Sequence, residues 1–472
     1  MLSVPCKDWR THSVGEGGNV PDDVSRHGMW SSRWLFVLAA TGSAVGLGNI
    51  WKFPYITGEN GGGAFVVVYL LCIAAIGIPI MMAEVMLGRS GRQSPINSMR
   101  SLIGESGGQR SWSVIGWMGV LAGVLILSFY AVIAGWAVFY VFRLASGVFE
   151  GVDGSQSSAL FGEFLSNPWA VLLWQTLFMV ATIVIVARGV ARGLEVAVRW
   201  LMPILLLLLV GLVGYAAVYG DFGQGFAFLF SFDASKLTWD GTLTAMGHAF
   251  FTLSLGMGAI MAYGAYMPSK ASISTTVVTI GVLDTVVALA AGLAIFPIVF
   301  VEGLVPGSGP GLMFETLPVA FGNLPFGAIL GTIFFLLVSF AAITSAISLT
   351  EPALAFLVEE YNAKRWRVAI SLGAVCWLLG IGTVLSFNVW ADAKLFGLTF
   401  FDLVDYVSGK IMLPLGGLLI AVFAGWVLNR RITDDQLGFE GWRRDVWDLV
   451  IRFVAPAGVL VVFGYTIYQS FG

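Results

Sequence analysis

Two glycine-rich stretches inside apolar segments are the places where this chain could bind small charged ligands. The first runs from Gly42 to Asn49 and the second from Ser254 to Gly258. Each glycine weakens a helix by about 1 kcal/mol relative to alanine, and in hydrocarbon every freed backbone group needs another partner. Freed carbonyls suit a cation, whereas N–H groups at the start of a half-helix suit an anionic group. The two breaks together predict one cavity that holds a metal cation and a zwitterion.

The composition indicates that these breaks lie in a lipid bilayer. Hydrophobic residues make up 57% of the chain and charged residues 11%, and the mean hydropathy is +0.86. The net charge of −3 is small and dispersed, so no basic surface suggests a nucleic-acid partner. We therefore expect an all-α, polytopic membrane protein.

Apolar runs of roughly 20 residues, the length that crosses about 30 Å of hydrocarbon, occur about eleven times. The second glycine break falls in the sixth run, five after the first. Because five is odd, the two breaks belong to units of opposite orientation, which predicts a 5+5 inverted repeat with unwound first and sixth helices. The runs begin near residues 34, 62, 115, 168, 201, 242, 272, 324, 367, 397 and 446. The expected units are a first repeat at about 30–220, a second at about 240–428 and an eleventh helix at about 446–470.

Lysine and arginine are distributed unevenly between the two sets of loops. Loops richer in these residues face the cytoplasm, and the poorer set holds little beyond Arg143, Lys236 and Lys394. This predicts a cytoplasmic N-terminus, an external C-terminus and a location in the cell (inner) membrane. Residues 1–29 are polar and carry no signal-peptide pattern, so we expect a cytoplasmic arm before a single transmembrane domain at 30–472. The basic set comprises Arg89, Arg92, Arg100, Arg110, Arg188, Arg192, Arg199, Lys270, Lys364, Arg365, Arg367, Arg430, Arg431, Arg443 and Arg444.

Four runs of residues resemble the signature of the sodium-coupled neurotransmitter and amino-acid symporters. They are GLGNIWKFP at 46–54, ENGGGAF at 59–65, FFTLSLG at 250–256 and AAITS at 341–345. The resemblance covers nearly the whole chain from about Trp30, although the usual twelfth span is missing. It implies a leucine-transporter-like fold and a single transmembrane transporter domain.

The resemblance implies two Na⁺ sites. Thr344 and Ser345 follow Ala341 at i+3 and i+4, so one helix face presents two hydroxyls beside a carbonyl. Taken alone, such a hydroxyl pair is also typical of helix packing in membranes. By resemblance, the second site combines these three residues with the carbonyls of Gly42 and Val45. The first site would use Ala44, Asn49, Thr252 and Asp284, together with the substrate carboxylate.

Asp284 occupies a position where many relatives have asparagine. An ionisable residue within a membrane span is a functional hypothesis by default. Its carboxylate could supply the negative charge that chloride supplies in animal members, which predicts transport without chloride. It could also take up a proton when the empty protein returns, and a protonated aspartate bonded to a neighbouring helix remains the alternative.

The resemblance also implies the class of substrate. Monoamine transporters of the family carry an aspartate where this chain has Gly46, and glycine leaves room for the carboxylate of an amino acid. No formal charge lies among the expected side-chain contacts, so a hydrophobic L-amino acid fits best. Met257 is slimmer and more adaptable than phenylalanine, so the pocket could admit Trp, Tyr or Phe as well as Leu. The expected substrate contacts are Ala44, Leu47, Gly48, Ile126, Tyr130, Phe251, Thr252, Ser254, Met257, Ser345 and Leu349.

Two gates complete the implied mechanism of alternating access. Lys52 and Asp405 resemble an outer ion-pair gate above a lid formed by Tyr130 and Phe251. The inner gate is expected to close through Trp30, Tyr266, Glu351 and Glu359, with either Arg26 or His27 as its cation.

The expected function is therefore symport, in which Na⁺ drives the import of a hydrophobic or aromatic L-amino acid. A membrane receptor or sensor that binds amino acids without moving them is the alternative. His12, His27 and His248 are scattered and have no suitable carboxylate partners, so the chain is not expected to be an enzyme. The sequence does not predict the oligomeric state.

Overall fold

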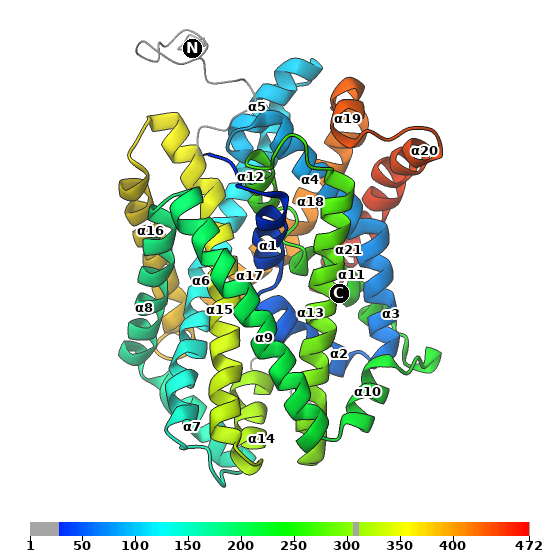
Figure 1. Ribbon diagram of the computed structural model, residues 1–472. Helices are drawn as coiled ribbons and strands as arrows, with labels where there is room; N and C mark the ends of the chain where they lie inside the picture. The colour runs from blue at the N-terminus through cyan, green and yellow to red at the C-terminus, as the bar shows by residue number, and fades with distance from the viewer. Residues whose placement is uncertain (1–27, 305–310, 472) are drawn as a thin grey trace.

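The computed structural model describes residues 28–304 and 311–471 as a bundle of helices (Figure 1). Within these residues the extended pairing is one isolated bridge between Leu395 and Leu398. The first half contains α1 (Arg33–Ala44), α2 (Phe53–Glu59), α3 (Gly63–Cys72), α4 (Ile78–Gly91), α5 (Pro95–Ser106), α6 (Val114–Ala145), α7 (Gly154–Ser166), α8 (Pro168–Ala187), α9 (Glu195–Tyr219) and α10 (Phe222–Phe230). The second contains α11 (Trp239–Thr252), α12 (Ala259–Ala265), α13 (Ile273–Val301), α14 (Leu317–Asn323), α15 (Gly327–Tyr361), α16 (Arg365–Ser386), α17 (Phe400–Asp405), α18 (Leu413–Val422), α19 (Arg430–Leu437), α20 (Trp442–Leu449) and α21 (Ala455–Phe471).

The expected spans correspond to helices of this bundle. Nine helical stretches in the described part of the chain are long and apolar enough to cross a membrane, and a tenth is the bent pair of α1 with Gly48–Glu59. The remaining expected span, the sixth, is divided between α11 and α12. The fifth begins earlier than the expected residue 201, because α9 starts at Glu195 after a π-helical turn over Val190–Leu194. Charged residues in these first turns hide the start of the helix from a hydropathy reading.

The first break separates α1 from the helical segment Gly48–Glu59, and the two axes differ by 51°. The chain at the break lies close to α6 and α15. A Cβ atom on Gly46 would lie 2.4 Å from the Ser345 Oγ and 3.0 Å from the Tyr130 hydroxyl. Only glycine therefore allows this backbone to approach both helices.

The second break spans residues 253–258, between α11 and α12. Ser254, Gly256 and Gly258 have positive φ values of 55°, 77° and 73°, which stop a right-handed helix. The buried carboxylate of Glu84 in α4 accepts a hydrogen bond of 2.5 Å from the Gly256 N–H. Glu84 thus supplies a partner for a backbone group that the break has freed.

The two ends of the bundle are formed by different short helices. Figure 1 shows α5, α19 and α20 at one end, and α7 and α14 at the other. The first end carries the basic residues Arg100, Arg430 and Arg444. The expected repeats and membrane orientation stay predictions, and nearly all of the expected arm at 1–29 lies outside the described residues.

Candidate functional site

The two breaks meet at a buried cavity between α1, α6, α11 and α15. Ten of the residues expected to contact the substrate line it. Thr252 is the exception, because its side chain faces Asp284 instead. Three further residues, Ser43, Gly46 and Ser348, contribute to the wall. The full lining is Ser43, Ala44, Gly46, Leu47, Gly48, Ile126, Tyr130, Phe251, Ser254, Met257, Ser345, Ser348 and Leu349.

One end of the cavity presents backbone N–H groups at the start of a helical segment. The Leu47 N–H lies 3.4 Å from the Tyr130 hydroxyl oxygen, and Gly48 begins the segment that continues into α2. The Phe251 ring covers this end, since a Cβ on Gly48 would lie 3.2 Å from two of its carbons. Such N–H groups, joined by a phenol, can bind a carboxylate.

Beside the cavity, Asp284 collects three polar side chains from three different helices. The Asn49 Nδ2 donates to its Oδ1 at 2.8 Å, and Thr252 Oγ1 lies 3.1 Å from both carboxylate oxygens. The Tyr69 hydroxyl is 3.4 Å from Oδ2. All four side chains are buried.

Asn49 keeps its own Oδ1 buried and without a hydrogen-bond partner. An unpaired buried oxygen beside a carboxylate and a hydroxyl matches the oxygen ligands that hard cations prefer. Ala44, the fourth expected ligand, is the last residue of α1. No further turn of α1 follows to donate a hydrogen bond to its carbonyl. The residues expected at the first Na⁺ site therefore fit that ion.

The residues expected at the second Na⁺ site come from α1 and α15. The Thr344 hydroxyl donates to the Ala341 carbonyl at 2.9 Å. Ser345 Oγ lies 3.4 Å from the Gly42 carbonyl oxygen, and a Cβ on Gly42 would come within 3.3 Å of the Thr344 Cβ. Val45, the fifth expected ligand, is buried directly after α1 ends. The donor set of hydroxyls and carbonyls fits a hard cation.

A second cavity, of about 170 Å³, lies beyond Tyr130 and Phe251, the residues expected to form the lid. Tyr130 and Phe251 belong to the walls of both cavities, so they separate one from the other. Lys52 and Asp405 both line the outer cavity, but the ion pairs found in the described residues do not include one between them. Instead, the Lys52 Nζ lies 4.4 Å from the centroid of the Phe251 ring.

The residues expected at the inner gate belong to a buried hydrogen-bond network. The Trp30 N–H donates to the Tyr266 carbonyl at 3.0 Å, and the Tyr266 hydroxyl donates to Glu351 at 2.8 Å. Arg365 donates to both oxygens of Glu351, at 3.0 and 2.5 Å. Arg26 and His27, the expected cations, lie outside the described residues. Arg365 was missed because it begins the following helix and carries no motif that links it to Glu351.

Two more carboxylates, Glu359 and Glu195, link the ends of neighbouring helices. Glu359 of α15 accepts hydrogen bonds from the N–H of Ser94, which precedes α5, and from the Asn97 side chain within α5. Glu195 of α9 accepts from the Ser31 N–H at 3.1 Å and from its hydroxyl at 2.7 Å. Glu195, like Arg365, was not among the expected gating residues. It anchors the start of α1 to the first turn of α9.

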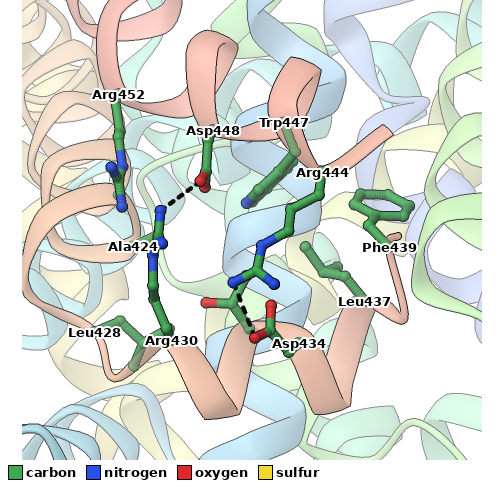
Figure 2. A pocket seen from close by; sticks show the side chains of 12 residues that line it. Ala424, Leu428, Arg430, Asp434, Leu437, Phe439, Arg444, Trp447, Asp448 and Arg452 are labelled. Carbon is green, nitrogen blue, oxygen red and sulfur yellow. Dashed lines mark hydrogen bonds and ion pairs between the residues drawn. The ribbon is translucent and has the colours of Figure 1, made fainter. Parts of the chain in front are cut away.

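A separate small pocket lies between α19 and α20, away from both breaks (Figure 2). Figure 2 shows two ion pairs across it, Arg430 with Asp448 at 2.6 Å and Arg444 with Asp434 at 3.0 Å. Both pairs are partly exposed, and within each pair the two charges neutralise each other. Such pairs contribute little to stability, and they join α19 to α20.

Comparison with known proteins identifies the family. The family model described as the sodium:neurotransmitter symporter family matches residues 27–148 and 162–471. An uncharacterized sodium-dependent transporter of Bacillus subtilis, YhdH, is 37% identical and aligns over 92% of this chain and 96% of its own length. A sodium-dependent transporter of Haemophilus influenzae is 32% identical over 92% of this chain and 97% of its own. The human sodium- and chloride-dependent GABA transporter 2 is 25% identical over 89% of this chain and 77% of its own.

A solved structure gives the corresponding match in three dimensions. The crystal structure of MhsT in complex with L-phenylalanine has a TM-score of 0.85, with 44% sequence identity over 92% of this chain and 99% of that one. This match confirms the predicted leucine-transporter-like fold, and the family match confirms that the protein is a transporter and not an enzyme. The chain belongs to the sodium:neurotransmitter symporter family, a family of multi-pass, sodium-coupled membrane transporters.

Proposed function

We propose that this protein is a symporter in which Na⁺ drives the import of a hydrophobic or aromatic L-amino acid. The observation that carries the proposal is the arrangement at the first break. The backbone of Leu47 and Gly48 lies at one end of an uncharged cavity, where the Leu47 N–H donates to the Tyr130 hydroxyl, and the unpaired Asn49 oxygen belongs to the next residue along the chain. The complex of MhsT with L-phenylalanine, at 44% identity, supports the same substrate class.

The substrate would bind with its carboxylate toward Leu47, Gly48 and the Tyr130 hydroxyl. Its ammonium group would meet the carbonyls of Ala44, Phe251 and Thr252, with Ser254 nearby, because these groups surround the two breaks. Its side chain would lie among Ile126, Met257 and Leu349, which offer apolar surface without a formal charge. A charged side chain would lose its hydration there without gaining a partner.

Two Na⁺ ions would bind at the two clusters of oxygen atoms. The first ion, at Ala44, Asn49, Thr252 and Asp284, lies beside the carboxylate end of the cavity, so ion and substrate would stabilise each other. The second ion, at Gly42, Val45, Ala341, Thr344 and Ser345, would hold α1 against α15. Each net positive charge that moves inward contributes about 2.3 kcal/mol per 100 mV of membrane potential, which allows accumulation of a zwitterion.

In this proposal Asp284 supplies the negative charge that a chloride ion would otherwise provide. Its carboxylate is buried within 3.1 Å of Thr252 and 2.8 Å of Asn49. A fixed negative charge at this distance compensates a bound Na⁺ in the way that a chloride ion otherwise could. We therefore infer that uptake is independent of chloride.

Alternating access would use the two gates in turn. In this proposal the network of Glu351, Arg365 and Tyr266 closes the inner side, and the cavity lined by Lys52 and Asp405 lies outside the lid. This conformation suits a substrate that arrives from outside. We propose that Lys52 and Asp405 approach each other once the site is filled, before the inner network separates.

The orientation follows from the positive-inside rule. The end formed by α5, α19 and α20 (Figure 1) would be cytoplasmic, because it carries the basic loops. The N-terminal arm would then lie in the cytoplasm and the C-terminus outside the cell membrane.

Purified protein in liposomes with an inward Na⁺ gradient tests the proposal. Labelled Leu, Phe, Trp, Gly and GABA would be offered with chloride and with gluconate in its place. Accumulation of Leu, Phe or Trp that needs Na⁺ and is unchanged in gluconate is the expected result. Binding of these amino acids without accumulation would contradict symport and favour a sensor, while selective accumulation of Gly or GABA would contradict the substrate class.

A further inference from the structure

A groove between α4 and α20 lies apart from the central cavity, with which it shares no lining residue. Its volume of about 330 Å³ falls in the range of sites for small ligands. Pro79 and Met82 contribute to it from the start of α4, and Ser274 from the first turn of α13. Phe439 and Trp447 separate the groove from the small pocket of Figure 2, because they line both.

The groove lies where a membrane-spanning segment begins. Residues Trp442–Tyr465 are one of the stretches that are long and apolar enough to cross a membrane, so Trp442 and Arg443 belong to its first turn. Figure 1 shows α20, which starts this segment, at the periphery of the bundle. Tryptophan is enriched at the level of lipid headgroups, and an arginine near the end of a span extends its charge to the same level. We therefore expect headgroups beside Trp442 and Arg443, and hydrocarbon beside Val446 and Val450, which follow Trp442 by four and eight residues and also line the groove.

The helix α20 presents an exposed apolar side next to the groove. Trp442, Val446 and Leu449 are spaced by four and three residues, so they share one side of the helix. All three are exposed, Trp442 by 71%. Trp447 is buried instead, and its ring centroid lies 6.1 Å from that of Phe439. A helix with one side packed and one apolar side exposed at this level offers a surface that lipid can cover.

The charge at the groove comes from the guanidinium of Arg443. Arg443 is exposed, and the ion pairs found in the described residues do not include it. Its Cζ lies 5.8 Å from the centroid of the neighbouring Trp442 ring. Glu440 and Asp445 are the acidic residues nearest to it in the sequence, and neither lines the groove. An exposed cation beside an apolar groove without a carboxylate complements an anionic group that is joined to a hydrocarbon chain.

We propose that this groove binds an anionic phospholipid. Its phosphate lies at Arg443 and Trp442, and one acyl chain runs along Met82, Val446 and Val450. Basic pockets between transmembrane helices recognise anionic headgroups in this way. A zwitterionic phospholipid brings an ammonium group for which the groove offers no carboxylate, so it should bind less tightly. This inference goes beyond the proposed function and does not depend on which solute the protein transports.

The test measures lipid binding to the full-length protein by native mass spectrometry in detergent. Phosphatidylglycerol and phosphatidylethanolamine with identical acyl chains are the two probes, because they differ in the charge of the headgroup. Arg443→Ala removes the cation, whereas Val446→Trp fills the groove without changing its charge. Arg431→Ala is the matched control, since Arg431 is an exposed arginine of α19 that lies outside the ion pairs found and lines neither the groove nor the small pocket.

We expect phosphatidylglycerol to bind more tightly than phosphatidylethanolamine. Arg443→Ala should weaken phosphatidylglycerol binding about 5-fold, the equivalent of about 1 kcal/mol for one arginine near an anionic membrane surface. Val446→Trp should weaken the binding of both lipids, and Arg431→Ala should change neither.

Equal affinity for the two lipids, or the same loss in Arg443→Ala and Arg431→Ala, would overturn the inference. A dimer in the mass spectrum that Val446→Trp converts to a monomer would also overturn it, because the groove would then hold a second copy of the chain. If Val446→Trp does not fold, the comparison of the two arginine variants decides alone. Uptake of amino acids is a separate measurement, so its absence would contradict the proposed function and leave this inference standing.

Discussion

Asn49 donates a hydrogen bond to Asp284 at 2.8 Å while its own amide oxygen stays buried and unpaired. Asn49 comes from the first expected span and Asp284 from the seventh. In the sequence the break between α11 and α12 lies between them. Their contact fixes which amide atom faces the carboxylate, because only the nitrogen can donate to it. The Asn49 amide oxygen is therefore left as an acceptor that a cation could use.

Replacement of Asp284 by asparagine tests the role of its charge. Asp284→Asn keeps the size of the side chain but removes the negative charge that would compensate Na⁺. We expect uptake in gluconate to fall at least 10-fold, with partial recovery when chloride is supplied. Labelled leucine flux in proteoliposomes, measured at several Na⁺ concentrations, reports both effects.

The control for this variant is Asp392→Asn, which changes an exposed carboxylate in the loop after α16. It should leave the flux and its anion dependence unaltered. Equal uptake by Asp284→Asn in chloride and gluconate, at the level of the unaltered protein, would show that the carboxylate does not replace an anion.

Gly46 gives a steric prediction. A methyl group at this position would lie 2.4 Å from the Ser345 Oγ and 3.0 Å from the Tyr130 hydroxyl. Gly46→Ala should therefore disturb the cavity and weaken substrate binding by at least 10-fold, because overpacking of a close contact shifts the backbone or its neighbours. Binding of labelled leucine to detergent-solubilised protein measures the loss.

Gly211→Ala is the matched control, since a Cβ at Gly211 in α9 meets nothing within 4 Å. Alanine there should preserve binding and slightly stabilise the helix. Similar affinities for the two variants would mean that the chain at the first break can shift without affecting the site.

Glu84 provides a prediction about stability. Its Oε1 accepts from the Gly256 N–H at 2.5 Å inside the membrane domain. Glu84→Leu leaves that N–H without its partner and should lower the free energy of unfolding by about 1–3 kcal/mol. Glu84→Gln keeps an acceptor at the same place and should lose less. Thermal unfolding in detergent compares the two variants, and an equal loss in both would argue against the hydrogen bond as the cause.

Sequence reasoning identified the two breaks because the glycines that cause each one lie within a short stretch of sequence. The glycines of 42–48 are recognisable from composition alone, whereas the hydroxyls of Thr344 and Ser345 are by themselves also typical of helix packing. The substrate contacts were expected from the family resemblance, and ten of them line one cavity. The match to a family then gave those residues roles that spacing could not.

Sequence reasoning failed where a partner comes from another helix and carries no motif of its own. Arg365 reaches Glu351 only because α15 and α16 fold back on each other, and Glu195 reaches Ser31 across 164 positions. The same applies to Glu84 and Gly256. A buried charge in an apolar span signals that a partner exists, but it does not say which residue that partner is.

Arg365 gives the final prediction, on the inner gate. Its guanidinium binds both oxygens of Glu351, which is fully buried, and planar bidentate pairing of this kind is specific to arginine. Arg365→Ala leaves the Glu351 carboxylate buried and unpaired, which costs about 3–5 kcal/mol in comparable pairs. The conformation with a closed inner gate should be destabilised by that amount, whereas an inward-open conformation, in which Glu351 is hydrated, should not be.

Amide hydrogen exchange over residues 30–44 should therefore become faster in the Arg365→Ala variant, because α1 would be released from the network. Arg367→Ala, which removes a neighbouring arginine that stacks on Trp366, should leave the exchange of α1 unchanged. Equal exchange of α1 in both variants would mean that the Glu351 pair does not hold the inner gate, and that Ser31 with Glu195 or the packing of Trp30 closes it instead.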